Sequence, residues 1–467
     1  MDGPDVLNSG FRAGLKAFAD ELSGLDDFFV LSHHDADGIT SCAVTVDLLR
    51  SLGKKVEYAC MKQIDSVTVE RIREHEGKTL VLTDFGSGHH SLLKEHGVEG
   101  YFVIDHHPPE MDYGRQINPS GYGYNGGSDV SGAGMAYLVA RTLGRTSMAH
   151  VAIVGAVGDM QDSGGALSSI NRLIAAEAVS QGLLAVEKDI RLFGRQSRTL
   201  VQMLTYSSEP IIPGLTGNQA ACGQFIESLG IRLKNGNVWR SYVELDPGER
   251  ERLNSAIYMR LVDYNTPDYI IHGMYGEVYT LSGEEQKSEL RDAKEYATVL
   301  NACGRHEEPD VGVRVCLGER GQAWRHAKSL LEKHRRQLAE GIEYLTEKGT
   351  KDMQNLRFFD SEGVIKESIV GVVAGMAYGA RIIPPDKPIL AFAQDANDEN
   401  FLKVSARANW GLVRRGIHLG NAMRECSKRC GGEGGGHDIA AGARVPKDRR
   451  DDFIRCVNST FSEQLTS

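Results

Sequence analysis

The stretch FFVLSHHDADG (residues 28–38) decides the fold class of this chain. A short apolar run ends at a cluster of polar residues, and a helical pattern follows over about 39–52. Strand patterns over 55–60, 79–83 and 100–104 alternate with further helical patterns. Short apolar strands separated by helices predict a parallel sheet with helices on its faces.

Polar side chains follow the predicted strands at the points where these strands end. Alternate residues of an extended segment point the same way, so His33, Asp35 and Asp37 project together. Ligands of open parallel sheets bind beyond the carboxyl ends of the strands, so one rim should collect polar groups from several strands. A further carboxylate, Asp159, ends a helical pattern over 148–157. The candidate rim residues are His33, Asp35, Asp37, Asp84, Asp105, His106, His107 and Asp159.

The residue types at this rim predict a metal centre. Each motif taken alone is also consistent with a solvated turn or a helix cap. Together they supply the mixture of carboxylates and imidazoles that suits Mn²⁺ and, less well, Mg²⁺. A pair of such ions makes hydroxide available near neutral pH and neutralises charge on a phosphodiester. The predicted ligands are His33, Asp35, Asp37, Asp84, His106 and Asp159.

The composition sets outer limits on function. The chain has 467 residues and a formal net charge of −10, which argues against coating nucleic acid by bulk charge. The N-terminal residues lack the pattern of a signal peptide, and no apolar run is long enough to span a membrane, so we expect a cytoplasmic protein. None of the eight cysteines forms a C-x-x-C pair, so we expect reduced thiols.

The ordered set of motifs resembles the DHH phosphoesterase superfamily, which is named after the motif seen here at residues 105–107. The resemblance implies that His107 contacts the scissile phosphate and that Asp105 orients the neighbouring histidines. His34 lies out of phase with the ligand side, so we assign it a structural or substrate-facing role. The implied metal ligands are His33, Asp35 and Asp84 for one ion, and Asp37, Asp84, His106 and Asp159 for the second, with Asp84 bridging.

The C-terminal part resembles the DHHA1 domain, which binds substrate in this superfamily. The resemblance rests on GGGH at 434–437 and AAG at 440–442. Glycines let backbone amides approach an anion closely, which favours a phosphate site over a merely flexible loop. Arg407, on a predicted strand over 402–407, could bind phosphate with two hydrogen bonds. The predicted substrate-binding residues are Ser405, Arg407, Gly434, Gly435, Gly436 and His437.

Within the superfamily, the chain length and the Ser405-Ala406-Arg407 strand resemble RecJ nucleases. The segments 212–217 and 300–305 resemble the archaeal RecJ-like group that includes the GINS-associated nuclease. The expected domains are a parallel-sheet α/β DHH domain at 1–190, an inserted, mainly helical module at 191–354, and a smaller α/β DHHA1 domain at 355–467 facing a cleft.

The expected function is a two-metal exonuclease of DNA replication or repair that degrades single-stranded DNA from 5′ to 3′. Its direction comes from the resemblance, because no residue by itself sets polarity. One alternative is a DHH phosphoesterase that acts on RNA or short oligonucleotides. Another is a structural replisome component that binds GINS through the inserted module, since a superfamily relative in eukaryotic replication forks has a degraded metal site. The complete ligand set of this chain favours activity.

Overall fold

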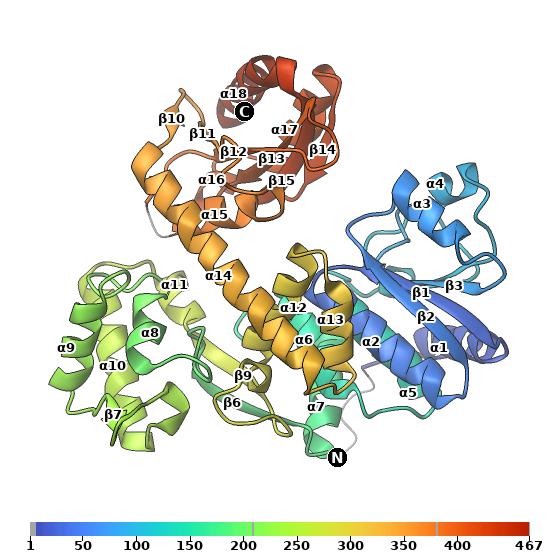
Figure 1. Cartoon of the computed structure of the whole chain (residues 1–467), viewed down its shortest axis with the longest axis horizontal. Helices are drawn as coiled ribbons and strands as arrows, with labels where there is room; N and C mark the ends of the chain where they lie inside the picture. Colours follow the sequence, from blue (N-terminus) through green and yellow to red (C-terminus); the bar gives the residue numbers. More distant parts are fainter. Residues whose placement is uncertain (1–5, 208–209, 380–381, 467) are drawn as a thin grey trace. The chain divides into compact units, whose positions relative to one another are not determined.

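The computed structural model describes residues 6–207, 210–379 and 382–466, which form two compact units divided in the chain between Leu331 and Glu332. Both units are mixed α/β, which confirms the predicted fold class (Figure 1). Among these residues, no helix has both the length and the apolar character that a membrane span requires.

The first unit is built on a parallel sheet with the strand order β2-β1-β3-β4-β5. Strand β1 is buried on both faces, which explains the continuous apolar run in its sequence. Phe28 and Val30 point into one apolar core, and Phe29 and Leu31 point into the other. The strands are β1 Asp27–His33, β2 Lys55–Met61, β3 Thr79–Thr83, β4 Phe102–Ile104 and β5 Gln116–Ile117.

Helices cover both faces of this sheet, as predicted. Helices α2, α5 and α6 pack against one another on one face, while α3 and α4 lie with the core of the other. Because β1, β3 and β4 are parallel, their carboxyl ends lie at the same edge of the sheet. The helices are α1 Ser9–Ser23, α2 Ala36–Ser51, α3 Ser66–Arg73, α4 His90–Glu95, α5 Gly132–Thr142, α6 Ala149–Gly158 and α7 Ser169–Ser180.

Residues 191–274 have an apolar core of their own. They lie between β6 (Leu184–Ile190) and β9 (Tyr275–Leu281), which pair antiparallel. This ribbon was not predicted, because β6 is buried mainly at its ends and its sequence shows no apolar run. The other elements of this segment are α8 Leu200–Thr205, α9 Gln219–Ser228, β7 Lys234–Asn235, β8 Val238–Trp239, α10 Pro247–Asp263 and α11 Asp268–Gly273.

The chain then returns to the parallel-sheet core. Helices α12 (Ala293–Arg305) and α13 (Pro309–Cys316) pack against α2 and α6 and share that core, and α14 (Gln322–Lys348) follows. The division into three domains at residues 190 and 354 stays a prediction. Helices α12 and α13 fall within the predicted inserted module, yet they pack with the core of the parallel sheet.

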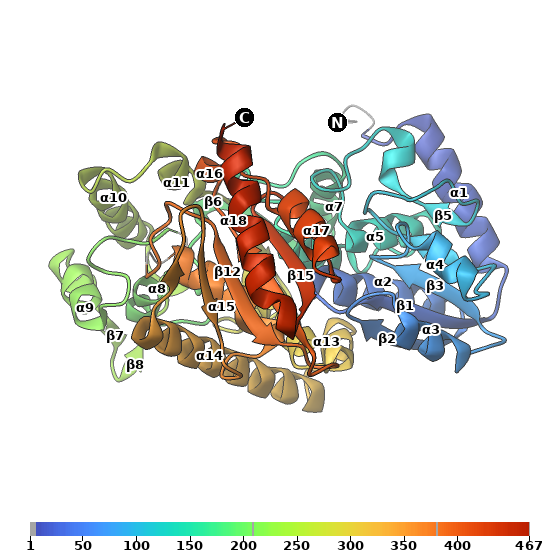
Figure 2. The same cartoon turned by 90° about the horizontal axis from the view of Figure 1, so that it is seen from above.

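The second unit contains a six-stranded sheet with the order β10-β11-β12-β13-β15-β14. Helix α15 (Glu367–Gly379) packs on β12 and β13, whereas α17 (Leu419–Arg429) packs on β14 and β15 beside α18 (Arg450–Thr466) (Figure 2). The strand predicted over 402–407 is present as β13. The strands are β10 Lys351–Asp352, β11 Arg357–Asp360, β12 Ile389–Gln394, β13 Phe401–Arg407, β14 Glu433–Gly436 and β15 Ala440–Pro446.

The cysteines differ from expectation in one place. Cys426 of α17 and Cys456 of α18 form a disulfide, so the expectation that all thiols are reduced is wrong for this pair. The two residues are separated by 30 positions in the chain, and only the packing of the two helices brings them together. The free thiols are Cys42, Cys60, Cys222, Cys303, Cys316 and Cys430.

Candidate metal centre

The turn from β1 into α2 carries the first three candidate residues. His33 ends β1, and Asp35 is the N-cap of α2, where its carboxylate accepts a hydrogen bond of 3.0 Å from the Gly38 amide. A side chain at Gly38 would collide with the carbonyl of His33. His33 Nδ1 lies 3.1 Å from Asp35 Oδ1. Asp35 is therefore a helix cap and, at the same time, part of the polar cluster.

Asp37 is held by two neighbouring helices. Its carboxylate is buried and accepts hydrogen bonds from the backbone amides of Gly132 (2.7 Å) and Ala133 (3.0 Å) at the start of α5. The helix N-terminus favours this negative charge. Any side chain at Gly155 of α6 would collide with the same carboxylate. The position of Asp37 is thus set by backbone atoms and does not depend on flexible side chains.

Asp84 follows β3 in a left-handed conformation, with φ of 59°. Its side chain is 2% exposed, and Oδ1 accepts no hydrogen bond from any residue that the structure describes. His106 Nε2 lies only 3.2 Å from this oxygen. A buried carboxylate is costly unless it is paired, and His106 pairs with Oδ1 only when its Nε2 carries a proton. A bound cation would satisfy the carboxylate.

His106 presents one particular nitrogen to these carboxylates. Its Nδ1 donates a hydrogen bond of 2.7 Å to the carbonyl of Gly126, so Nε2 is the atom left to bind a cation or a proton. Nε2 lies 3.2 Å from Asp84 Oδ1 and 3.7 Å from Asp37 Oδ2. Burial lowers the pKa of His106, but the surrounding carboxylates raise this pKa well above its usual value. The pocket therefore favours a positive charge at this nitrogen.

Asp159 completes the cluster from the end of α6. Its Oδ2 lies 4.0 Å from His106 Nδ1. Burial and the charge of Asp84 raise the pKa of Asp159 to about 6. The pKa of Asp37 is also raised, first by burial and then by Asp84. Carboxylates that resist ionisation beside one another are typical of a site that is stabilised by cations.

Asp105 and His107 form a second layer at the same rim. Asp105 is fully buried and accepts hydrogen bonds from the amides of Ser87, His106 and His107. It also accepts a bond of 2.9 Å from His107 Nδ1, which leaves Nε2 of His107 to other partners. The side chain of His107 is 53% exposed. Burial raises the pKa of Asp105, but these hydrogen bonds and the charges of His107 and His106 lower this pKa to about 2.

The structure therefore brings together all eight rim residues predicted from the sequence. Their candidate ligand atoms fall into groups in which every pair lies within 4.8 Å. Carboxylate oxygens with imidazole nitrogens fit Mn²⁺ or Mg²⁺, and Asp84 belongs to two of the groups. The groups are His33, Asp35 and Asp84; Asp37, His106 and Asp159; and Asp84, Asp105, His106 and His107.

His34 lies between helix α12 and His33, with its ring centroid 5.1 Å from that of His33. A side chain at Gly304 would collide with the carbonyl of His34, and Asn301 Oδ1 accepts a hydrogen bond of 3.0 Å from the amide of Ala36. Burial and the charge of His33 lower the pKa of His34 to about 4. The segment 300–305 thus braces the turn that carries the ligands. The sequence marked this segment only as part of a resemblance.

The predicted substrate-binding residues of the second unit divide between two faces of its sheet. Ser405 of β13 pairs with Gly442 of β15, which in turn pairs with Gly435 of β14, so these three share a face with Arg407. Helix α15 approaches this face so closely that a side chain at Gly371 would touch Ser405 and Arg407.

Gly434 and Gly436 point to the opposite face, toward α17. A side chain at Gly434 would lie 2.8 Å from the carbonyl of Met423, and one at Gly420 would collide with the carbonyl of Gly436. The glycine-rich segment is an extended edge strand here, and close helix packing explains two of its glycines. His437 follows this strand and is exposed.

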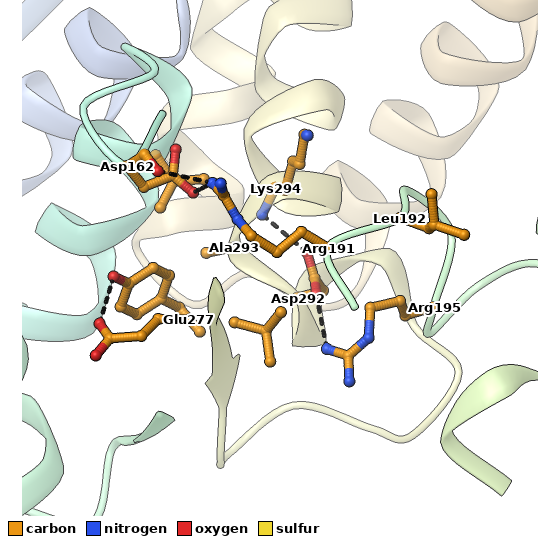
Figure 3. Close-up of a pocket in the computed structure, with 11 residues that line it drawn as sticks. Asp162, Arg191, Leu192, Arg195, Glu277, Asp292, Ala293 and Lys294 are labelled. Atoms are coloured by element: carbon orange, nitrogen blue, oxygen red, sulfur yellow. Dashed lines mark hydrogen bonds and ion pairs between the residues drawn. The ribbon is translucent and has the colours of Figure 1, made fainter. Parts of the chain in front are cut away.

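A small pocket lies away from the predicted metal ligands, at the base of the β6–β9 ribbon. In the part of the chain that the structure describes, its lining contains none of those ligands, and several of its charged groups form ion pairs (Figure 3). Arg191 pairs with Asp162, and Arg195 pairs with Asp189 and lies 4.0 Å from Asp292. Ion pairs at this pocket connect the β6–β9 ribbon with the core of the first unit.

Comparison with known families finds three domains in series. Residues 27–157 match the DHH family N-terminal domain, residues 192–274 match the DHH-CID domain, and residues 367–463 match the DHHA1 domain. The first match covers the β1, β3 and β4 strand ends, and the third covers β13, β14 and β15. The uncharacterized protein MJ0831 of Methanocaldococcus jannaschii is 28% identical over 448 residues, which are 93% of each chain.

Solved structures share the fold across nearly the whole chain. RecJ of Thermus thermophilus, in complex with Mn²⁺, is 18% identical with a TM-score of 0.60, and the match covers 99% of this chain and 56% of RecJ. The chain thus spans about half the length of that protein. CDC45 of Entamoeba histolytica is 12% identical with a TM-score of 0.63, and the match covers 97% of this chain and 98% of CDC45. A manganese-bound exonuclease RecJ is 17% identical with a TM-score of 0.57 and coverages of 98% and 96%.

Proposed function

The chain is a RecJ-like member of the DHH superfamily of metal-dependent phosphoesterases, and from this premise we propose that it degrades single-stranded DNA from the 5′ end, in replication or repair. The observation that carries the proposal is the buried Asp84 carboxylate, which lies among imidazoles and carboxylates and belongs to two of the groups of candidate metal ligands. Such a group is suited to bridge cations. The same reaction on RNA or short oligonucleotides is the alternative, and the experiment below separates DNA from RNA.

The described residues fit a pair of divalent ions, Mn²⁺ in preference to Mg²⁺. Bound ions of this kind would supply a water molecule of lowered pKa and would neutralise charge on the phosphodiester. The chain's own contribution is to hold the ligands rigidly through helix N-termini and backbone amides. The proposed ligands are His33, Asp35 and Asp84 for one ion, and Asp37, Asp84, His106 and Asp159 for the other.

His107 is the residue proposed to contact the scissile phosphate. Asp105 orients its ring through Nδ1, and the Nε2 side is available because half of the side chain is exposed. Burial lowers the pKa of His107, but the hydrogen bond to Asp105 has the larger effect and raises this pKa. A protonated imidazole fixed in this way donates a charge-assisted hydrogen bond to a phosphate oxygen.

The second unit is proposed to bind the strand that is being degraded. Ser405, Gly435 and Arg407 share one face of its sheet, as a phosphate site requires. His437, next to the edge strand, is exposed and within the same domain match. Gly434 and Gly436 remain part of the proposed set only through their backbone amides, since they face α17.

The test compares DNA and RNA single strands labelled at either end, with Mn²⁺, Mg²⁺ or chelator. Wild type should release short products from the 5′ end of DNA only with a divalent ion, and Asp84→Asn should release none. Asp20→Asn, which changes an exposed carboxylate outside the site, is the control and should behave as wild type. Uncut strands with Mn²⁺ would refute the nuclease proposal, and equal cutting of RNA would refute the DNA preference.

A structural role in the replisome, with GINS as partner, is the second candidate. The likeness to CDC45 over nearly the full length of both chains favours it. The segment 191–274 also exposes large apolar side chains that a partner could cover. These are Tyr206, Val238, Trp239, Tyr258, Met259, Val262, Tyr264 and Tyr269. Co-purification with GINS by wild type, lost when Trp239 and Tyr264 are both changed to Ser, would support this role; GINS binding that persists in the double variant would exclude this surface.

A further inference from the structure

The turn that ends α6 directs the side chain of Gln161 into the protein interior. Asp159 is the last capping residue, and Met160 follows with φ of 58°, in the left-handed region. The amide of Gln161 then bonds to the carbonyl of Ala156 at 3.0 Å, and that of Met160 bonds to Val157 at 3.1 Å. This pair of bonds is a Schellman motif, which closes the helix and reverses the chain. Met160 is left in solvent, while Gln161 is 7% exposed.

The Gln161 amide joins two parts of the candidate centre. Its Nε2 donates a hydrogen bond of 2.8 Å to Asp159 Oδ2 and another of 2.8 Å to the carbonyl of Gly126. The same carbonyl accepts the bond from His106 Nδ1 that leaves Nε2 facing the carboxylates. A side chain at Gly126 would collide with the carbonyl of His106, so the loop that contains Gly126 packs directly on the segment that carries His106.

The orientation of this amide is set by a second buried residue. Asn171 of α7 is 1% exposed, and its Nδ2 donates a hydrogen bond of 2.6 Å to Gln161 Oε1. Because a side-chain amide has one donor end and one acceptor end, this bond turns Nε2 toward the centre. From the other side, Arg191 binds the backbone and side chain of Asp162 (Figure 3). The turn after α6 is therefore held on two sides.

From these contacts we infer that Gln161 is a positioning residue of the metal centre, which holds Asp159 and the Gly126 carbonyl in the places that the ligands need. This inference rests on the proposed function. Partners that orient ligands through hydrogen bonds change metal affinity by about 10–100-fold when they are lost. Gln161 touches two such elements at once, whereas a residue that merely fills the core would touch neither.

The test is calorimetric titration of the metal-free full chain with Mn²⁺, beside its thermal unfolding in chelator. Gln161→Met keeps the size of the side chain and removes the donor, and should weaken Mn²⁺ binding about tenfold or more. Gln286→Ala, which changes an exposed glutamine in a turn, is the matched control and should bind as wild type. Binding by folded Gln161→Met within about twofold of wild type would overturn the inference.

A second variant covers the case in which Gln161→Met does not fold. Asn171→Leu leaves Gln161 in place and takes away only the donor that orients it, so Mn²⁺ binding should weaken in the same direction. Unchanged binding by Asn171→Leu would then refute the positioning role. Failure of wild type itself to bind Mn²⁺ would refute the proposed metal centre, whereas normal wild-type binding with unaffected variants would refute only the inference about Gln161.

Discussion

Neutralising Asp84 should change stability in opposite directions with and without metal. Without metal, the Asp84 charge disfavours ionisation of Asp37 and Asp159. Asp84→Asn removes this repulsion while keeping the side-chain shape. Asparagine also tolerates the left-handed backbone at this position. The same substitution removes the attraction of Asp84 to His33 and His106, whose pKa values it raises although burial lowers them. We expect the loss of repulsion to be the larger effect, so the metal-free protein should become more stable.

The size of this effect follows from Asp159. Its pKa is raised from 3.8 to about 6, which corresponds to about 3 kcal/mol before allowance is made for exposure. The side chain is 36% exposed and burial is the larger cause, so the share of Asp84 is about 1 kcal/mol. In contrast, Mn²⁺ at a hundredfold excess over its Kd should stabilise wild type by about 2.7 kcal/mol. Asp84→Asn should lose most of that gain.

Urea unfolding at pH 7, in chelator and in Mn²⁺, measures both quantities. We expect the midpoint of Asp84→Asn to lie above that of wild type in chelator and below it in Mn²⁺. Asp20→Asn should follow wild type under both conditions. An Asp84→Asn protein that is less stable in chelator and still stabilised by Mn²⁺ would refute the view that this carboxylate is held for a cation.

Three further outcomes are expected from the same site. Because burial and Asp84 raise the pKa of Asp159 to about 6, the metal-free protein should lose stability as pH rises from about 4 to 6, where only the unfolded chain ionises this group; Asp159→Asn should flatten that part of the profile in urea titrations. The pKa of Asp105 is lowered to about 2, so the ionised carboxylate stabilises the folded protein above about pH 4, and this stabilisation is lost as pH falls toward 2. Asp105→Asn should lower the free energy of unfolding by about 2 kcal/mol at pH 7. The same substitution should lower nuclease kcat, because it releases the ring of His107. Gly132→Ala should cost about 2 kcal/mol or more and should weaken Mn²⁺ binding in calorimetry, because its methyl group would collide with the Asp84 carboxylate.

Matched measurements give these outcomes their controls. Gly164 has no atom near an added Cβ, so Gly164→Ala should leave stability and Mn²⁺ binding unchanged. A pH profile that Asp159→Asn does not alter would contradict the assigned pKa shift. Asp105→Asn with wild-type stability would show that its buried hydrogen bonds contribute little. Normal Mn²⁺ binding by Gly132→Ala would show that the Asp84 pocket can widen.

The sequence alone was sufficient for the parallel sheet and for the set of polar residues that gather at one edge of it. Strand β1 is buried on both faces, so it reads as an unbroken apolar run, and the parallel order of β1, β3 and β4 places their ends at one edge. Residues at these ends meet wherever such a sheet forms. Period and polarity are local properties, and they can be read from a single chain.

Tertiary structure decided what depends on contacts between distant segments. Gln161 is an ordinary polar residue in the sequence, and it gains a role only because the end of α6 turns it toward the carbonyl of Gly126. Strand β6 of the β6–β9 ribbon is invisible to periodicity because all of its residues except the two end ones are exposed or half-buried. Gly434 and Gly435 look alike in sequence, yet Gly434 faces α17 and Gly435 lies on the opposite face of the sheet, which it shares with Ser405, since the face of a strand residue depends on register. Register, helix approach and hydrogen-bond direction arise only when the chain has folded.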